Sequence, residues 1–429
     1  MMTSGSGNVR GVRDPVFVRA TGAGTGGIAT LILDGDGFML RLDAMLRSKP
    51  KLRDATTGDL LYGKFHDSFG RFIDEVIAAP ISSKSSTTGN QQVELSCHGG
   101  LGAVAAVEAA LLEAGFAQGR ATELLERAHL NGLLSLIAME AQLRLAKAMT
   151  ERQAQFLLGH EALQKKWERH GFDMAMGLRT RELGWRETLF NHARQSLEDA
   201  KSAAALLRQH RVAIVGPVNA GKSTLANALA RSDRHIVSPI PGTTLDVLET
   251  AIDLRGLHVL LMDTAGRRSS SDELEAAGQG RAERAAASAN LRICLLDGSH
   301  APADEDVALL QRLTDAGPTL LVLNKSDLGV SDEGQGLSFI AGRDAISISA
   351  QTGAGIPELE QAIERTLLNG GDPEASMPFT RRQTAHIEAI RSALQQGVEG
   401  TEFLIHVRRL IGTRPDIEEM SVVLDEANT

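Results

Sequence analysis

Between residues 207 and 373, short apolar runs alternate with stretches in which apolar residues recur every three or four positions. The runs are rich in β-branched residues and are typical of strands buried on both faces of a parallel sheet. The stretches between them have the spacing of amphipathic helices. We therefore predict a doubly wound α/β domain that binds its ligand at the carboxyl ends of the strands. The apolar runs are RVAIV, HVLLM, LRICLL, TLLVL and AISIS.

The segments that flank this domain have a different pattern. Helical spacing dominates residues 121–206, as in LNGLLSLIAMEAQLRLAKAM, and it returns within residues 374–429, as in TRRQTAHIEAIRSALQ. The simplest architecture is one discontinuous α-helical domain built from both segments, with the α/β domain inserted between them. A conformational change in the inserted domain would then act directly on the helices.

Composition and charge narrow the functional classes. With 429 residues the chain is long enough for about three domains, and 42% hydrophobic residues are typical of a globular protein. The net charge of −9 argues against an electrostatic grip on nucleic acid over the whole surface. One Tyr and two Trp offer little area for base stacking, so any RNA contact is expected to be confined to one region. Two cysteines, no transmembrane run and no signal peptide favour a cytoplasmic protein without membrane contact.

The first apolar run is followed by the loop GPVNAGKST and then by a helical stretch. A strand, a G-x-x-x-x-G-K-S loop and a helix in this order are the signature of a phosphate-binding loop. The backbone N–H groups of such a loop point at phosphate oxygens beside the positive end of the helix. Lys222 is expected to reach the β- and γ-phosphates, and the Ser223 hydroxyl is expected to ligate magnesium. The predicted nucleotide contacts in this loop are Gly216, Asn219, Ala220, Gly221, Lys222, Ser223 and Thr224.

Polar residues follow the later apolar runs and complete the predicted nucleotide site. Asp263, at the end of HVLLMD, is expected to hold magnesium through water, and Gly266 is expected to offer an N–H to the γ-phosphate. The NKSD stretch contributes Asn324, Lys325 and Asp327. Guanine presents two adjacent N–H donors that one carboxylate can accept, whereas adenine would leave that carboxylate unpaired. The stretch therefore predicts GTP and GDP as ligands rather than ATP.

Two further segments belong to the predicted site. Ser349 and Ala350 follow the last apolar run, where they are expected to contact the base. Thr243 and Thr244 lie in PGTTLD, and Thr244 is interpreted as the switch threonine that closes over magnesium when the γ-phosphate is present. An ordinary threonine-rich turn before a strand is the alternative. Together these signatures resemble those of the GTPases related to translation factors.

Three segments outside this domain carry a more specific resemblance: GTGGIATLILDG, VELSCHGG and ERAHLNGLLSLIAMEA. With the GTPase signatures, they resemble the tRNA-modification GTPases of the MnmE (TrmE) family from about residue 16 to residue 412. The resemblance implies an α/β multidomain protein with an N-terminal α+β domain that dimerises and binds a tetrahydrofolate derivative. The implied domains are residues 1–120 for the N-terminal domain, 121–206 and 374–429 for the helical domain, and 207–373 for the GTPase domain.

The resemblance also implies residue roles and partners. Asn219 matches the residue that helps this family to bind potassium, and Glu275 matches the glutamate that orients the attacking water, so Glu275 and Lys222 are the expected catalytic residues. The family forms homodimers, hydrolyses GTP in a potassium-stimulated manner, and acts with a flavin-dependent partner protein on the wobble uridine of tRNA. By its spacing alone, Glu275 is equally interpreted as a solvated glutamate in the first turn of a helix.

The sequence departs from the family pattern at several positions. The family ends in a cysteine-x-glycine-lysine motif, whereas this chain ends in DIEEMSVVLDEANT and has no cysteine after Cys294. Thr25 and Leu133 replace an arginine and a lysine, which removes charges that would hold an anionic folate. Two hypotheses follow: a GTPase that takes part in tRNA wobble-uridine modification, or a diverged regulatory GTPase switch that has lost this chemistry.

Overall fold

A computed structural model describes residues 13–22, 24–180, 184–232, 248–263, 285–329, 345–396 and 402–412 of the chain. The chain divides into two compact units. The first comprises the described residues of 1–143 and 405–429, and the second comprises those of 144–404. None of the helices in the described ranges is both long and apolar enough to span a membrane.

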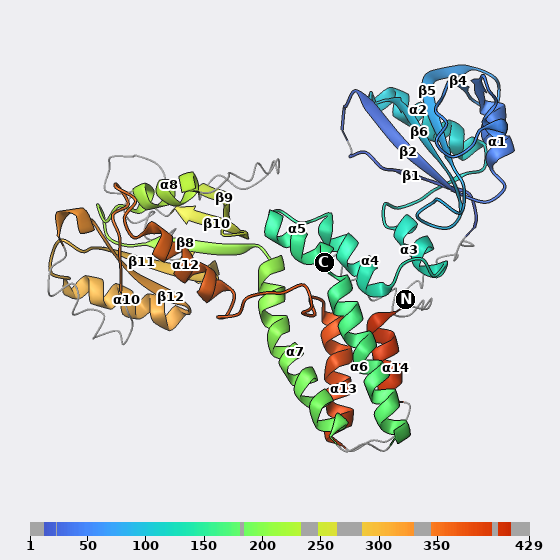
Figure 1. Ribbon diagram of the computed structural model, residues 1–429. Coiled ribbons are helices and arrows are strands. Elements are labelled where there is room, and N and C mark those ends of the chain that lie inside the picture. The colour runs from blue at the N-terminus through green and yellow to red at the C-terminus, as the bar shows by residue number, and fades with distance from the viewer. Residues whose placement is uncertain are drawn as a thin grey trace, which may run out of the picture. The chain divides into compact units, whose positions relative to one another are not determined.

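The first unit is built on a seven-stranded sheet in the order β3-β4-β5-β6-β2-β1-β7 (Figure 1). Neighbouring strands are antiparallel except for β1 and β7, which pair in parallel. The strands are β1 (Val16–Arg19), β2 (Ile28–Gly35), β3 (Leu46–Ser48), β4 (Leu61–His66), β5 (Phe72–Ile81), β6 (Gln91–His98) and β7 (Ala117–Gln118). The helical elements are α1 (Met39–Met45), η1 (Leu52–Asp54), α2 (Leu101–Glu113) and α3 (Glu123–Leu130). Two further helices, α4 (Leu136–Leu145) and α14 (Glu402–Ile411), contribute residues to both units.

One face of this sheet is apolar and covered, and the other is open. Strand residues alternate between buried and exposed positions, as the period of two requires. The inward residues pack against the apolar sides of α1 and α2, for example Leu95 and Leu31 against Leu42, Val107 and Leu111. This packing buries one face of every central strand and forms the core of the unit.

A buried ion pair ties α3 to this sheet. The Asp34 carboxylate is fully buried and accepts hydrogen bonds of 2.9 Å from Arg127, Asn90 and Gln92. The Arg127 guanidinium also pairs with Glu123 at 3.1 Å. A buried charge of this kind is tolerated because every group has partners, so removing one of them would be costly.

The second unit contains a six-stranded sheet in the order β13-β12-β11-β8-β10-β9. In Figure 1 the helices α8 and α10 lie on opposite faces of this sheet, as expected for a doubly wound domain. The strands are β8 (His210–Val215), β9 (Leu248–Leu254), β10 (Leu257–Asp263), β11 (Leu291–Asp297), β12 (Thr319–Asn324) and β13 (Ile346–Ser347). The helical elements are α8 (Lys222–Ser232), α10 (Asp304–Ala316), η2 (Ser326–Leu328) and α12 (Ile356–Leu367). Each apolar run of the sequence prediction contributes to a strand.

The five predicted strands are parallel, and the sheet has one further strand at its edge that is antiparallel. β9 pairs with β10 in an antiparallel manner, whereas β8, β10, β11, β12 and β13 are parallel. The reason is the two-residue connection Arg255–Gly256, in which both residues have positive φ, 50° and 84°. Two successive residues of this kind form the tight hairpin turn that returns the chain beside itself.

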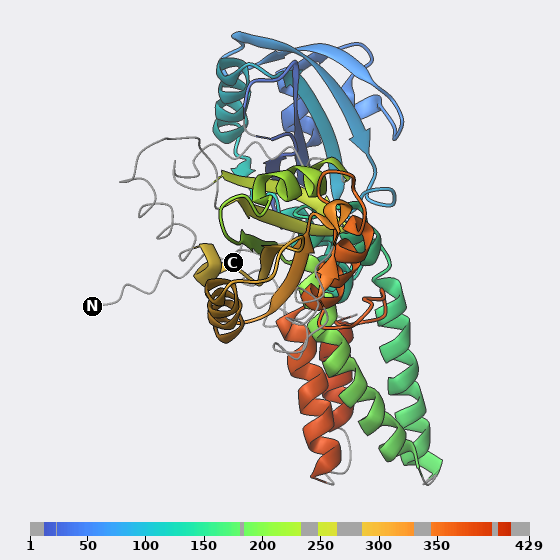
Figure 2. The same ribbon diagram turned by 90° about the vertical axis from the view of Figure 1, so that its left-hand side faces the viewer.

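Long helices make up the rest of the second unit. They are α5 (Glu151–Leu158), α6 (Glu161–Thr180), α7 (Trp185–Leu207) and α13 (Arg381–Gln395). Figures 1 and 2 show α13 alongside α7, although these helices lie on opposite sides of the GTPase-like segment in the sequence. Thr150 and Thr380 cap the start of α5 and α13 by accepting from the backbone N–H three residues later. The segments with helical spacing thus contain helices, as expected. That these helices assemble into one discontinuous domain stays a prediction.

Candidate functional site

The loop between β8 and α8 has the backbone of a phosphate cradle. Asn219 and Gly221 have positive φ of 64° and 96°, a conformation that turns successive N–H groups toward one point. A Cβ on Gly216 would lie 2.0 Å from the carbonyl oxygen of Leu295, and a Cβ on Gly221 would lie 2.3 Å from Nδ2 of Asn324. Both positions therefore require glycine, because the loop passes directly over the ends of two neighbouring strands.

Lys222 begins the helix that follows this loop. Its Nζ donates to the carbonyl oxygens of Gly216 at 2.9 Å and Pro217 at 2.7 Å, which places the ammonium group over the loop. The Ser223 and Thr224 side chains are exposed in the first turn of α8. A cation, two exposed hydroxyl-bearing side chains and the positive end of a helix thus lie in one small region, and this set is suited to a phosphate chain with its metal ion.

Asn324 joins the phosphate loop to the segment that was predicted to bind the base. Its side chain is almost fully buried, donates to the carbonyl oxygen of Ala220 at 2.7 Å, and accepts from the backbone N–H of Ala350 at 2.9 Å. Ala220 and Ala350 lie 104 and 26 residues from Asn324 in the sequence. One amide therefore holds three loops at the carboxyl edge of the sheet in fixed relation to each other.

Lys325 is held in place by a residue that the sequence analysis did not single out. Its Nζ lies 2.6 Å from Oδ2 of Asp297, at the end of β11, while its backbone has a positive φ of 67°. Burial raises the pKa of Asp297, but hydrogen bonds from Lys325 and Ser299 outweigh this effect and lower the pKa to about 2. Asp297 directly follows an apolar run, as Asp263 does. Its position at the end of a predicted strand was the sequence signal by which it could have been recognised as a site residue.

Asp327 lies on the turn that follows Lys325, and its side chain is exposed. The neighbouring Ser326 N–H donates to the carbonyl oxygen of Ile348 at 3.0 Å, so the turn is tied to the segment that carries Ser349 and Ala350. A cavity of about 600 Å³ opens beside these loops. Its lining includes Thr224 and Asn227 of α8 and Ala350 and Gln351 after β13.

The remaining predicted residues are placed only in part. In the parallel pair of β10 and β8, Asp263 lies opposite Ile214, one residue before the end of β8. The backbone of Asp263 is therefore at the carboxyl edge of the sheet, next to the phosphate loop. The residues predicted around the γ-phosphate that lie outside the described residues are Thr243, Thr244, Gly266 and Glu275.

The described residues fit a magnesium-bound guanine nucleotide. The two glycines let the loop pass close to Leu295 and Asn324, Lys222 and the start of α8 supply positive charge, and the Asp327 side chain is exposed. Oxygen donors such as the Ser223 hydroxyl are the ligands that magnesium prefers. The arrangement can bind phosphates at one end and read a base with two N–H donors at the other.

Comparison with known proteins adds independent information. A family model described as "50S ribosome-binding GTPase" matches residues 211–325, and one described as "GTP-binding protein TrmE N-terminus" matches residues 15–133. The tRNA modification GTPase MnmE of Synechococcus sp. (strain WH7803) is 36% identical over 365 residues, which are 80% of this chain and 79% of the relative. The protein of the same name from Paramagnetospirillum magneticum is 32% identical over 444 residues, 96% of this chain and 98% of the relative.

Proposed function

The chain belongs to the MnmE family of tRNA modification GTPases, and from this membership we propose that it hydrolyses GTP to drive modification of the wobble uridine of certain tRNAs. The observation that carries the proposal is the Asn324 bridge, because it unites a phosphate loop with the segment suited to guanine. Neither loop alone would distinguish GTP from other phosphorylated ligands.

Catalysis by this site is positional and electrostatic. Lys222 and the loop amides bind the phosphates, while Ser223, Thr244 and Asp263 organise the magnesium ion. When bound, magnesium neutralises the charge that develops on the phosphoryl oxygens. Glu275 orients the attacking water, and the amide of Gly266 donates to the γ-phosphate. The remaining nucleotide contacts are Thr224, Thr243, Asn324, Lys325, Asp327, Ser349 and Ala350.

A potassium ion beside Asn219 is a further part of the proposal. The Asn219 side chain is exposed on the phosphate loop, and its positive φ is one that asparagine and glycine tolerate well. We expect faster GTP turnover in potassium than in sodium. Asn219→Gly keeps the backbone conformation and removes the amide, so it should abolish this difference without loss of GDP binding. Equal rates of the wild-type protein in both salts would refute the potassium site.

The proposed cellular context is a cytoplasmic homodimer that acts on tRNA with a flavin-dependent partner protein. The N-terminal domain would form the dimer, and the inserted GTPase domain would move the helices that flank it. We do not assign a tetrahydrofolate cofactor, because Thr25 and Leu133 lack the charge that an anionic folate requires.

Deletion of the gene followed by mass spectrometry of tRNA nucleosides tests the proposal. Loss of a wobble-uridine modification is expected, with recovery from a plasmid that carries the wild-type gene and no recovery from one that carries Asn324→Ala. An unchanged nucleoside profile would favour the alternative, a regulatory GTPase switch without tRNA chemistry.

A further inference from the structure

A cleft of about 750 Å³ lies between β3 and β4 of the first unit, away from the phosphate loop in the sequence and in a different unit. Four of the residues that line it are cationic: Arg47, Lys49, Lys51 and Lys64. Tyr62, the only tyrosine of the chain, lines it as well. The cleft therefore combines positive charge with an aromatic ring in a protein whose net charge is −9.

The charge in this cleft is not neutralised by ion pairs. Within the described ranges, none of the four cations has a carboxylate at ion-pair distance, whereas the nearby Arg53 pairs with Asp43 at 3.1 Å. Arg47 and Lys64 lie directly opposite each other in the antiparallel pair of β3 and β4. Like charges in that position repel each other and destabilise a sheet, and a bound anion would relieve this repulsion.

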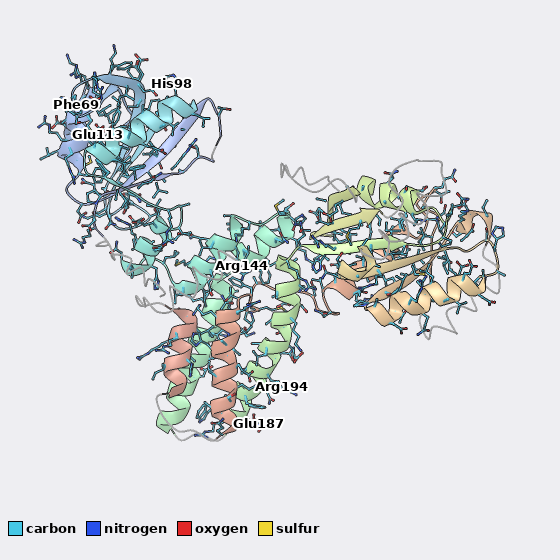
Figure 3. All side chains as sticks on the ribbon, turned by 180° about the vertical axis from the view of Figure 1, so that it is seen from behind. Phe69, His98, Glu113, Arg144, Glu187 and Arg194 are labelled. Carbon is cyan, nitrogen blue, oxygen red and sulfur yellow. The ribbon has the colours of Figure 1, made fainter. Side chains whose placement is uncertain are left out.

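Exposed aromatic side chains lie beside part of this set. Tyr62 and Phe72 are both more than half exposed, and the Lys64 ammonium lies 5.9 Å from the centre of the Phe72 ring. Phe69, which Figure 3 labels on this unit, is exposed in the loop between β4 and β5. A hydrogen bond to Glu75 raises the pKa of Tyr62 and restrains its hydroxyl. Exposed rings beside cations are the usual platform for unpaired bases.

Glu75 is an acidic residue that lies next to this set. It lies opposite Lys64 in the pair of β5 and β4, but its carboxylate is beyond ion-pair distance of the Lys64 ammonium. It accepts a hydrogen bond from the Tyr62 hydroxyl instead. Its charge offsets part of the charge of Lys64 and leaves Arg47, Lys49 and Lys51 unbalanced. These three follow one another along β3 and the segment after it, and such a row fits a chain of phosphates better than a single anion.

We propose that this cleft binds the phosphodiester backbone of a single-stranded RNA loop, with one base stacked on Tyr62. The inference rests on the proposed function, because a tRNA that is modified at its wobble position must present the unpaired anticodon loop. A paired duplex hides the faces of its bases, so the aromatic ring would contribute nothing to duplex binding. The cleft would thus supply the confined RNA contact that the overall acidic charge requires.

Fluorescence anisotropy of labelled RNA with the full-length protein tests this inference. The titrations are made between 50 and 200 mM KCl, which is about the range over which phosphate contacts respond to salt. The probes are a tRNA transcript, its anticodon stem-loop and a fully paired, blunt-ended duplex of equal length. The double variant Lys49→Glu/Lys51→Glu should weaken loop binding about tenfold or more and reduce the salt slope by about 1.4. Lys84→Glu, on an exposed loop of the same unit, is the matched control and should bind as the wild-type protein does.

Tyr62 variants separate stacking from charge. Tyr62→Leu should weaken binding of the loop about 5-fold to 150-fold and leave the salt slope unchanged, whereas Tyr62→Phe should retain affinity. GTP hydrolysis should be the same in all these variants, and thermal unfolding of the full-length protein checks that the first unit still folds.

Three results would overturn the inference in whole or in part. If the double variant binds the tRNA and its stem-loop as tightly as Lys84→Glu does, RNA binds elsewhere and the inference is wrong. The proposed function would still be upheld if gene deletion abolishes the modification. If the wild-type protein binds the paired duplex as tightly as the stem-loop, the role of Tyr62 is refuted. Absence of RNA binding together with an unchanged nucleoside profile would refute both proposals.

Discussion

Replacement of Asn324 by alanine tests the link between the phosphate loop and the base loop. The side chain makes two hydrogen bonds with buried backbone groups, to Ala220 at 2.7 Å and from Ala350 at 2.9 Å. Each buried group that loses its partner costs about 1–3 kcal/mol. Because two groups lose their partner, the variant is destabilised by about 2–6 kcal/mol in the state in which the loops are held together.

Nucleotide binding requires that same state, so most of the loss should appear in affinity. Because 1.4 kcal/mol corresponds to a factor of ten, we expect GDP affinity to fall by about 30-fold or more. Calorimetric titration of the purified protein with GDP in magnesium buffer measures the change. Thermal unfolding without nucleotide measures the part of the loss that appears as lower stability.

Asn290→Ala is the matched control. Asn290 accepts a hydrogen bond of 2.8 Å from the backbone N–H of Arg211, at the amino end of the same sheet. Its replacement should lower stability without a change in GDP affinity. A GDP affinity of Asn324→Ala within threefold of wild type, or an equal loss in Asn290→Ala, would refute the bridging role.

Three further predictions concern other parts of the second unit. Gly216→Ala should abolish GDP binding in calorimetry, because its Cβ would lie 2.0 Å from the carbonyl oxygen of Leu295; GDP binding at wild-type affinity would contradict the close approach. Arg152→Ala should lower the free energy of urea unfolding by about 1–3 kcal/mol, because Arg152 pairs with the partly buried Glu364 and donates to the carbonyl oxygen of Arg255, just before β10. GDP binding should not weaken. Burial lowers the pKa of His210 from 6.5 to about 4. Between these two pH values the unfolded chain binds a proton that the folded protein does not, so the free energy of unfolding should decrease as the pH falls from 6.5 to about 4. His210→Gln should flatten this dependence in urea titrations, and an unchanged slope would contradict it.

Much of the second unit could be predicted from the sequence because its signals are local. The strands β8, β10, β11 and β12 coincide with apolar runs, and the phosphate loop lies between a strand and a helix as its spacing requires. The antiparallel β9 was missed, although Arg255–Gly256 is a local signal. A two-residue turn is read correctly only when both flanking segments are first recognised as strands.

The cleft in the first unit could not be predicted in this way. Arg47 and Lys64 are far apart in the sequence, and each looks like an ordinary solvated cation in isolation. Only the register of β3 and β4 places them opposite each other, with Tyr62 two residues before Lys64 on β4. Strand register depends on packing of the whole sheet, which no short segment contains.

The sequence alone therefore determined the chemistry of the GTPase loop and its preference for guanine, because residue type and short spacing are sufficient for a backbone cradle and a carboxylate. Tertiary structure decided which distant groups meet: Asn324 with Ala220, Lys325 with Asp297, and the cations along β3 and β4. Those contacts arise when parallel strands end at a common edge or antiparallel strands align, and long-range packing sets both.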